Sequence, residues 1–344
     1  MATNKTCEFF IQWHLTERCN LRCKHCYQTE RNIEEMHLSE INEVISEVSE
    51  MLNAWSENYD IYFSTSFNVT GGEPFLHQDI FKILEEIKRK EFDIYILSNG
   101  TLINRERAKR LLDLAVKGVQ VSIEGPENVH ESIRGKGSFY SSLEGIQNLL
   151  EAGIKVTLNV TLSEINADYF MDIVALSSSL GVHRLGFSRL VPSGRGKRLF
   201  NKMISKERAK EIYEKMYSLN INGLEITTGD PVASQMTIHS NENDSGSVPK
   251  GGCAAGISGL TLLPDGTIMP CRRLNVPIGN VRKDSLREVW VSSEVLQQLR
   301  DKEIYKGKCG ICRRWAACRG CRAIAYAHSG DLFTEDPQCF ITEI

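Results

Sequence analysis

The stretch Glu17–Gln28, ERCNLRCKHCYQ, holds three cysteines, Cys19, Cys23 and Cys26, in the spacing C-x3-C-x2-C. Three closely spaced thiolates on a loop can bind three irons of a cubane [4Fe–4S] cluster, whose fully ligated form takes four cysteines. The missing fourth thiolate leaves one iron open, which is what a catalytic metal site requires. Zinc with His25 as a fourth ligand is the rival. It is disfavoured because the short chain between Cys23 and Cys26 leaves that imidazole little room to reach a tetrahedral site.

The remaining cysteines strengthen the case for metal. The chain has eleven cysteines; three lie in residues 19–26, seven lie after residue 252, and none lies between these groups. An odd count argues against complete disulfide pairing. Clustered thiolates in a reducing compartment are typical of metal binding. The isolated Cys7 is interpreted as an ordinary thiol.

Length and composition exclude several classes of protein. A chain of 344 residues with 41% hydrophobic and 25% charged residues is typical of a globular protein of about two domains. The net charge of −3 provides no basic field for nucleic acid. No uncharged apolar run reaches the ~18 residues that a membrane span needs. The N-terminus lacks a signal-peptide core, so we expect a cytoplasmic protein that binds neither nucleic acid nor membrane.

Strand and helix patterns alternate outward from the cysteine loop. Strand-like runs lie at 9–14, 61–70, 93–98, 119–123, 155–162 and 184–191, and helical patterns lie at 39–55, 78–90, 104–116, 139–153 and 167–181. Ser39 is a candidate N-cap, and the last two helices are followed by glycine. Alternation of this kind predicts an α/β fold with a parallel sheet. Six units are too few for a complete eightfold barrel and predict a partial (β/α)6 TIM-type barrel.

The pattern changes after residue 200. A helix is predicted at 206–220, a polar loop at 234–252, and a hairpin around Pro264-Asp265-Gly266. We therefore expect a barrel over 1–200, a bridging helix and linker over 201–252, and a small cysteine-rich domain over 253–344. A tail with so little apolar surface needs additional covalent or metal links.

The cysteine loop resembles the radical S-adenosylmethionine (SAM) superfamily, with the aromatic Tyr27 following the third cysteine. Gly71-Gly72-Glu73-Pro74 ends the second predicted strand, as the family's motif for the methionine amino group does. The resemblance implies that SAM would chelate the open iron and that the reduced cluster would cleave it. A 5′-deoxyadenosyl radical would then take a hydrogen atom from substrate.

The resemblance also implies the SAM-binding residues, all near carboxyl ends of predicted strands. Ser98 and Asn99 end the third strand, and Ser122 ends the fourth. Arg134 corresponds to a carboxylate-binding arginine in many members. Asn159 and Leu190 lie where members hold ribose and adenine. The expected SAM-binding set is Tyr27, Gly71, Gly72, Glu73, Pro74, Ser98, Asn99, Ser122, Arg134, Asn159 and Leu190.

The C-terminal cysteines resemble the SPASM extension, which holds two auxiliary [4Fe–4S] clusters. The family's pairing assigns Cys309, Cys312, Cys318 and Cys339 to an outer cluster, and Cys253, Cys271 and Cys321 to an inner one. The inner cluster then has only three thiolates. A zinc ribbon is the alternative, but its paired CxxC units are normally separated by roughly 15–20 residues; here only RRWAA separates Cys312 from Cys318. Three [4Fe–4S] clusters and SAM are the expected cofactors.

Arginines accompany these cysteines. Arg313, Arg314, Arg319 and Arg322 surround the outer set and could compensate the charge of a cluster or form a solvated face. Arg195, Lys197 and Arg198 are interpreted mainly as a solvated loop.

SPASM enzymes mostly modify peptides or proteins, so the resemblance implies a peptide maturase, with a thioether or related crosslink as a hypothesis from the open inner cluster. An external flavodoxin- or ferredoxin-type electron donor is implied. About ten residues precede the first strand, so leader recognition would fall to another surface or to a separate protein.

Two enzyme alternatives and one non-catalytic alternative remain. Enzymes of haem and cofactor biosynthesis share this architecture. Sulfatase maturation is disfavoured because Arg272 follows Cys271, where sulfatase-maturating members place an aspartate as base. A non-catalytic electron carrier would need neither the GGEP motif nor an open cluster. No catalytic base is assigned.

Overall fold

One curved sheet organises the molecule. A computed structural model of the chain describes residues 5–29, 33–236 and 248–341, so most of the loop predicted at 234–252 lies outside the described residues. The first seven strands pair side by side, all parallel and in chain order. They are β1 (Lys5–His14), β2 (Ile61–Thr70), β3 (Asp93–Ser98), β4 (Gly118–Ser122), β5 (Val156–Leu162), β6 (Arg184–Arg189) and β7 (Glu225–Thr228). The predicted partial parallel barrel is confirmed.

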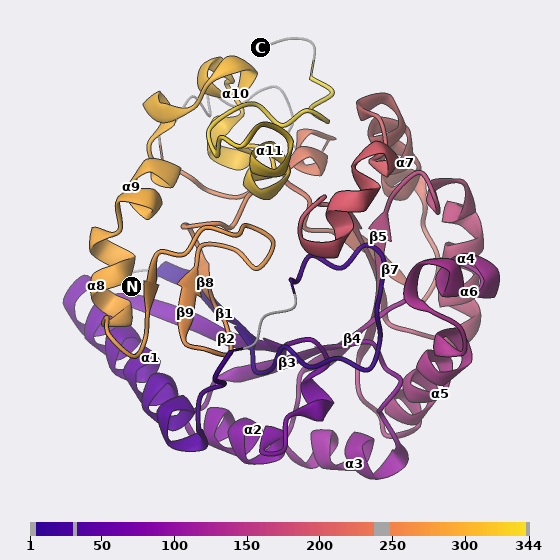
Figure 1. Cartoon of the computed structure of the whole chain (residues 1–344), viewed down its shortest axis with the longest axis horizontal. Coiled ribbons are helices and arrows are strands. Elements are labelled where there is room, and N and C mark those ends of the chain that lie inside the picture. The colour runs from indigo at the N-terminus through magenta and orange to yellow at the C-terminus, as the bar shows by residue number, and fades with distance from the viewer. Residues whose placement is uncertain (1–4, 30–32, 237–247, 342–344) are drawn as a thin grey trace.

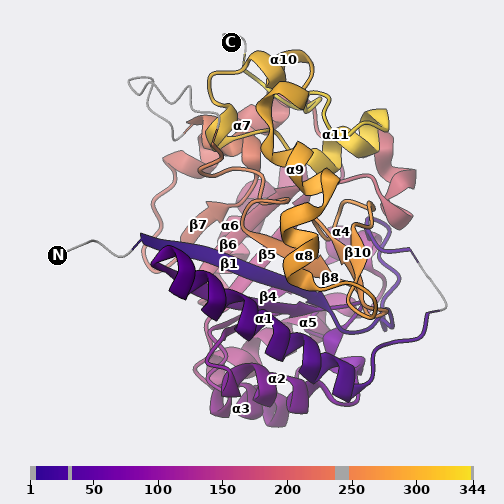
Figure 2. The same ribbon diagram turned by 90° about the vertical axis from the view of Figure 1, so that its left-hand side faces the viewer.

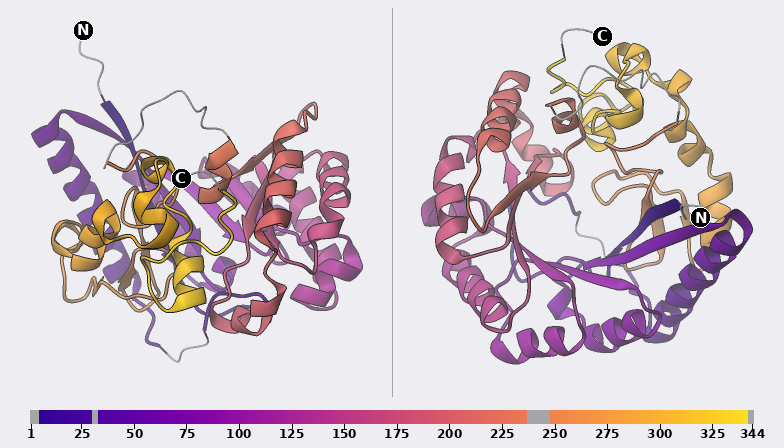
Figure 3. Two further views of the ribbon diagram at one scale, coloured as in Figure 1. Left: turned by 90° about the horizontal axis from the view of Figure 1, so that it is seen from above. Right: turned by 180° about the vertical axis from the view of Figure 1, so that it is seen from behind.

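Helices cover the outer face of this sheet and form a ring around it (Figure 1). They are α1 (Leu38–Tyr59), α2 (Ile80–Arg89), α3 (Arg105–Asp113), α4 (Glu127–Arg134), α5 (Ser138–Glu151), α6 (Phe170–Leu180) and α7 (Lys206–Ser218). The view from behind shows the same ring, left open on one side of the crescent (Figure 3).

Alternation along the strands explains why the barrel interior is polar. In β5, Val156, Leu158 and Val160 are fully buried, whereas Thr157 and Asn159 on the opposite face are partly exposed. Side chains alternate between the two faces of a strand, so the apolar set packs against the helices and the polar set faces inward. A polar interior is suited to ligands rather than to a packed core.

The C-terminal part closes the open side of the crescent. Its first strand, β8 (Gly259–Leu262), pairs parallel with β1, and β9 (Thr267–Met269) and β10 (Gly279–Asn280) extend the sheet antiparallel. The turn between β8 and β9 confirms the hairpin predicted around Pro264-Asp265-Gly266.

Helix α8 (Leu286–Ser292) packs beside the β1 edge (Figure 2). Its Trp290 ring lies 5.0 Å from the ring of Phe9 in β1 and 6.4 Å from that of Trp55 in α1. Three short helices, α9 (Glu294–Arg300), α10 (Gly307–Ile311) and α11 (Arg322–Ser329), follow it. Among the described residues, no helix is long and apolar enough to cross a membrane.

Three local features differ from the sequence prediction. Strand β7 lies in the segment predicted as a bridging helix and linker, and α4 was not predicted. The N-cap of α1 is His37 rather than Ser39, which lies inside the helix. The reason is that Glu40 reaches back to accept a hydrogen bond from the His37 backbone N–H at 2.7 Å.

Candidate functional site

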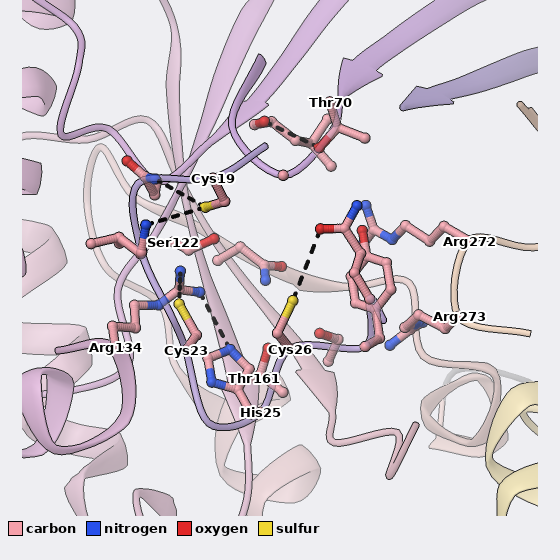
Figure 4. Close-up of a pocket in the computed structure, with 18 of the residues that line it drawn as sticks. Cys19, Cys23, His25, Cys26, Thr70, Ser122, Arg134, Thr161, Arg272 and Arg273 are labelled. Atoms are coloured by element: carbon pink, nitrogen blue, oxygen red, sulfur yellow. Dashed lines mark hydrogen bonds between the residues drawn. The ribbon is translucent and has the colours of Figure 1, made fainter. Parts of the chain in front are cut away.

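The three cysteines of the N-terminal loop face one pocket at the carboxyl ends of the barrel strands. Cys19, Cys23 and Cys26 line a cavity of about 140 Å³ (Figure 4). Backbone hydrogen bonds hold this loop at several points: Lys24 N–H donates to the Ile133 carbonyl at 2.8 Å, and Gly196 N–H to that of Cys26 at 3.0 Å. These bonds attach the cysteine loop to the end of α4 and to the segment that follows β6.

The GGEP turn packs directly against the start of the cysteine loop. A Cβ atom on Gly71 would lie 2.6 Å from the Thr16 carbonyl oxygen, and one on Gly72 would lie 2.3 Å from that of Arg18. Gly72 N–H donates to the Thr16 carbonyl at 2.7 Å. Only glycine permits this close approach. The turn thus supports the loop that presents the cysteines.

Glu73 connects the GGEP turn to the next strand end. Its buried carboxylate accepts hydrogen bonds from Ser98 Oγ and from the Asn99 N–H, each at 2.8 Å. Burial raises the pKa of Glu73 to about 7, against the opposing effect of these hydrogen bonds. Asn99 in turn directs its Nδ2 toward Cys19 Sγ at 3.9 Å. Glu73 therefore braces the pocket wall rather than lining the pocket.

Arg134 lines the pocket as part of a buried charge cluster. Its guanidinium contacts the Glu124 carboxylate at 2.5 and 2.9 Å and reaches Cys23 Sγ at 3.8 Å. His25 Nε2 also lies 3.3 Å from that carboxylate. Burial alone would raise the pKa of Glu124, but the charges of Arg134 and His25 hold it well below its usual range. The sequence prediction assigned no role to Glu124, because its pairing with Arg134 and with His25 of the cysteine loop depends on how these segments fold together.

Most of the remaining predicted SAM-binding residues gather at this pocket. Those lining it are Tyr27, Gly71, Gly72, Ser98, Asn99, Ser122, Arg134 and Asn159. Leu190 is buried outside this lining, and its neighbour Val191 lines the pocket instead. Pro74 begins a short 3-10 helix, Pro74–Leu76, behind the turn.

The four cysteines predicted for an outer cluster line one small enclosed cavity of about 20 Å³. They are Cys309, Cys312, Cys318 and Cys339. Gln235 Nε2 points at Cys318 and Cys339 at 3.6 and 3.5 Å. Burial raises the pKa of Cys318 to about 12. A bound metal would therefore be needed to hold this sulfur as a thiolate.

The three cysteines predicted for the inner cluster lie between this cavity and the barrel. Cys253 N–H donates to the Cys318 carbonyl at 3.1 Å. Cys321 interacts electrostatically with Cys253 and with Arg273. Arg273 also interacts electrostatically with Cys271. The arrangement fits a set of three thiolates beside the barrel.

The cysteine side chains are spaced more widely than the ligands of one metal ion. Throughout the described ranges, no three His, Cys, Asp or Glu side chains converge closely enough to share one metal ion, as a tetrahedral zinc site requires. In a cubane each thiolate binds a different iron, so wider spacing of the sulfurs is compatible with it.

Arg189, which sequence reasoning missed, joins the barrel to the C-terminal part. Its fully buried guanidinium contacts Asp230 at 2.8 Å and Asp336 at 2.7 Å. Asp336 also accepts a hydrogen bond from the Cys321 N–H at 2.8 Å. The ion pairs thus connect the end of β6 to a predicted cluster ligand. They were not predictable because Arg189 and Asp336 are far apart in sequence.

Comparison with known families and proteins agrees with this geometry. Residues 13–177 match the model of the radical SAM superfamily, and residues 253–322 match that of SPASM, an iron-sulfur cluster-binding domain. An AdoMet-dependent heme synthase of Nitratidesulfovibrio vulgaris is 32% identical over 97% of this chain and 92% of that protein. An Fe-coproporphyrin III synthase of Methanosarcina barkeri is 28% identical over 97% of this chain and 88% of that protein.

Other similar proteins include a maturase and two proteins of known structure, one of them solved with a precursor peptide. The mycofactocin maturase MftC of Mycolicibacterium smegmatis is 26% identical over 96% of this chain and 82% of that protein. The structure of anSMEcpe with bound AdoMet has a TM-score of 0.73 at 18% identity, covering 96% and 94% of the two chains. That of Streptococcus suis SuiB with its precursor peptide SuiA has a TM-score of 0.72 at 16% identity, covering 97% and 76%.

Proposed function

Because this chain belongs to the radical SAM superfamily and carries a SPASM domain, we propose that it uses a SAM-derived radical to oxidise a tetrapyrrole. Cys19, Cys23 and Cys26 would hold the SAM-binding cluster. When bound, that cluster and SAM supply a 5′-deoxyadenosyl radical that takes a hydrogen atom from substrate. The seven C-terminal cysteines would hold the auxiliary clusters. A flavodoxin- or ferredoxin-type protein would be the electron donor.

The protein's own residues position SAM and exclude water in this proposal. Arg134, held by Glu124, would pair with the SAM carboxylate. Asn99 and Ser122 line the same pocket and would orient the rest of the cofactor. Fixing both reactants in one geometry can supply a large part of a rate enhancement.

The observation that carries the tetrapyrrole proposal is a pair of cavities beside the cysteine pocket. One, of about 570 Å³, has an apolar part formed by Phe200, Leu263, Met269, Ala323 and Tyr326. The other, of about 720 Å³, occupies the polar barrel interior. Sites for large organic ligands are typically ~300–1,000 Å³ and mostly apolar with a few polar groups. A flat apolar ring with polar substituents is suited to such a space, and the relatives named as haem and coproporphyrin synthases support this class.

The test is substrate-dependent SAM cleavage by the anaerobically reconstituted enzyme. Dithionite-reduced protein is given SAM with coproporphyrin III or its iron complex, and 5′-deoxyadenosine and the porphyrin mass are followed. We expect a tetrapyrrole to raise 5′-deoxyadenosine above the background rate and to yield a product of changed mass. A protein with Cys19, Cys23 and Cys26 all changed to alanine should do neither. If no tetrapyrrole raises the rate, the proposal fails.

Peptide modification is the second candidate, supported by the mycofactocin maturase relative and by the three-thiolate inner set Cys253, Cys271 and Cys321. A cysteine-containing peptide could bind an open iron through its thiol, since such an iron favours a soft ligand; a thioether is the product we would expect. Leader recognition could then require a separate protein. The discriminating experiment replaces the porphyrin with short peptides encoded beside the gene. A peptide that raises SAM cleavage, when porphyrins do not, would favour this candidate.

A further inference from the structure

Two consecutive arginines lie where the cavities meet. Arg272 and Arg273 follow Cys271 directly, and both line the 140 Å³ cysteine pocket, the 570 Å³ cavity and the 720 Å³ barrel interior. Figure 4 shows both side chains reaching into the pocket from the C-terminal part of the chain. A substrate occupying either large cavity would have to pass or contact them.

In the described part of the chain neither arginine forms an ion pair with an acidic side chain, although Asp230 interacts electrostatically with Arg273. Arg272 Nη1 donates to Gln12 Oε1 at 3.3 Å, and its guanidinium lies 5.9 Å from the Tyr27 ring centre. Arg273 Nη1 makes only a long hydrogen bond, 3.5 Å, to the Arg189 carbonyl. Its Nε is buried without a hydrogen-bond partner. Both guanidinium groups therefore line the cavities with few hydrogen bonds to the protein.

Two other arginines of the same pocket, Arg134 and Arg189, are neutralised by acidic side chains. Arg134 has Glu124, and Arg189 has Asp230 and Asp336. No described acidic side chain lines the cysteine pocket itself. A buried guanidinium without a counterion is costly, so such a group is usually paired with an anion. Arg273 interacts electrostatically with Cys271 and Cys321. The charge of Arg272, whose guanidinium contacts Gln12 and Tyr27, remains for an outside anion.

We propose that Arg272 and Arg273 form a clamp that binds a carboxylate of the substrate and orients it beside the SAM pocket. The planar fork of a guanidinium matches a carboxylate in two parallel hydrogen bonds, which gives direction as well as affinity. The proposal rests on the proposed function and adds to it the chemical group that the enzyme recognises.

The test measures binding of coproporphyrin III and of its tetramethyl ester, which lacks free carboxylates, to the reconstituted enzyme. Both are titrated in the same dilute detergent and followed by porphyrin fluorescence. We expect the wild-type enzyme to bind the acid at least about tenfold more tightly than the ester. Arg272→Gln and Arg273→Gln should each weaken acid binding by about 10- to 100-fold, equivalent to about 1.4–2.7 kcal/mol. Binding of the ester should not change.

Three controls separate this role from others. Arg313→Gln removes an exposed positive charge beside Cys312 and should leave porphyrin binding unchanged. Arg272→Lys keeps the charge without the fork and should fall between wild type and Arg272→Gln. Iron content and SAM affinity should be unchanged in Arg272→Gln; if Arg273→Gln loses iron, Arg272→Gln carries the test.

The outcomes distinguish the clamp from the proposed function. If the preference for the acid survives in Arg272→Gln and Arg273→Gln, the clamp is wrong and the tetrapyrrole function stands. If these variants lose SAM affinity instead, the carboxylate that the arginines bind belongs to SAM, and the proposal is overturned. If neither porphyrin binds the wild-type enzyme, the proposed function fails, and the clamp fails with it as a tetrapyrrole site.

Discussion

Arg134 and Glu124 illustrate how a residue of the SAM pocket depends on a partner that motif matching does not reveal. The Glu124 carboxylate has no exposed surface and lies 2.5 Å from the Arg134 guanidinium. Removing one member of a buried ion pair leaves the other charge without compensation and typically costs about 3–5 kcal/mol. A single substitution at either position therefore mixes an effect on SAM with an effect on stability.

A double variant separates these two effects. Arg134→Met should destabilise the protein by up to about 3–5 kcal/mol, and Glu124→Gln combined with Arg134→Met should recover most of that loss. Both proteins should bind SAM more weakly than wild type, because the cation expected at the SAM carboxylate is absent. Melting temperature and SAM affinity are measured on reconstituted protein. Normal SAM binding by the double variant would show that the carboxylate partner lies elsewhere.

His130 gives the molecule a calculable sensitivity to acid. The ring is fully buried and its Nδ1 accepts a hydrogen bond from the Glu124 N–H at 3.3 Å. Burial, together with the charge of Arg134, lowers the pKa of His130 from 6.5 to about 4. The pKa of His130 is lower in the folded protein than in the unfolded chain, so the unfolded chain takes up the proton first as the pH falls. The stability of the fold is therefore unaffected by His130 above pH 6.5 and is lost progressively as the pH falls toward 4.

At pH 5 the loss attributable to His130 should be about 2 kcal/mol. We expect the melting temperature of wild type to fall more between pH 7.5 and pH 5 than that of His130→Asn, whose Oδ1 takes the place of the accepting Nδ1 and does not titrate. Both proteins lose clusters in acid alike, so the comparison cancels that effect. Parallel pH profiles for the two proteins would contradict the assignment.

At the scale of elements, the sequence predicts what depends on local pattern. Alternation and helical periodicity predict β1 to β6 and six of the helices that cover them, because burying one face of each element produces a repeating pattern along the chain. Strand β7, only four residues long, and the eight-residue α4 carry too few repeats to be seen. The N-terminal cysteine motif and the GGEP turn are visible because their residues lie close together along the chain, whereas the C-terminal cysteine sets are assigned from their resemblance to the SPASM extension.

Contacts between distant elements were not predictable from the sequence. The pairing of Arg134 with Glu124, and of Arg189 with Asp336, depends on how strands and loops come together. The position of Arg272 and Arg273 where three cavities meet depends on the same arrangement of strands and loops. Each of these residues alone resembles an ordinary surface charge in the sequence.

The contact between the GGEP turn and the cysteine loop can be tested by one methyl group. In Gly72→Ala the new Cβ would lie 2.3 Å from the Arg18 carbonyl oxygen, which is backbone and cannot rotate away. The loop would have to move, and Cys19 would move with it. We expect reconstituted Gly72→Ala to lose roughly a third of its iron, the share of one cluster in three. Gly229→Ala, where a Cβ meets nothing within 4 Å, should keep all of it.

At the scale of the whole molecule, Arg189 holds the C-terminal part on the barrel. Arg189→Met would leave Asp230 and Asp336 as buried carboxylates without their shared cation, at a cost of about 3–5 kcal/mol. We expect this variant to melt earlier and to become susceptible to proteolysis after residue 248.

A matched control lies on the same strand. Arg184 pairs with Glu225 at the exposed end of β6, and surface pairs contribute only about 0–1 kcal/mol. Arg184→Met should therefore behave like wild type. Equal effects of the two substitutions would show that burial of the Arg189 pairs is not what joins the two parts.

The pairing of β1 with β8 joins two strands that the ribosome makes at widely separated times. β1 leaves the ribosome well before the strand that covers its outer edge, Gly259–Leu262, which is made some 250 residues later. At about 5–20 residues per second, that edge stays unpaired for roughly 12–50 seconds. An open strand edge is a template for pairing with another chain. The nascent barrel is therefore most exposed to aggregation just before the auxiliary-cluster segment emerges, and slow translation of residues 200–260 should lower its soluble yield.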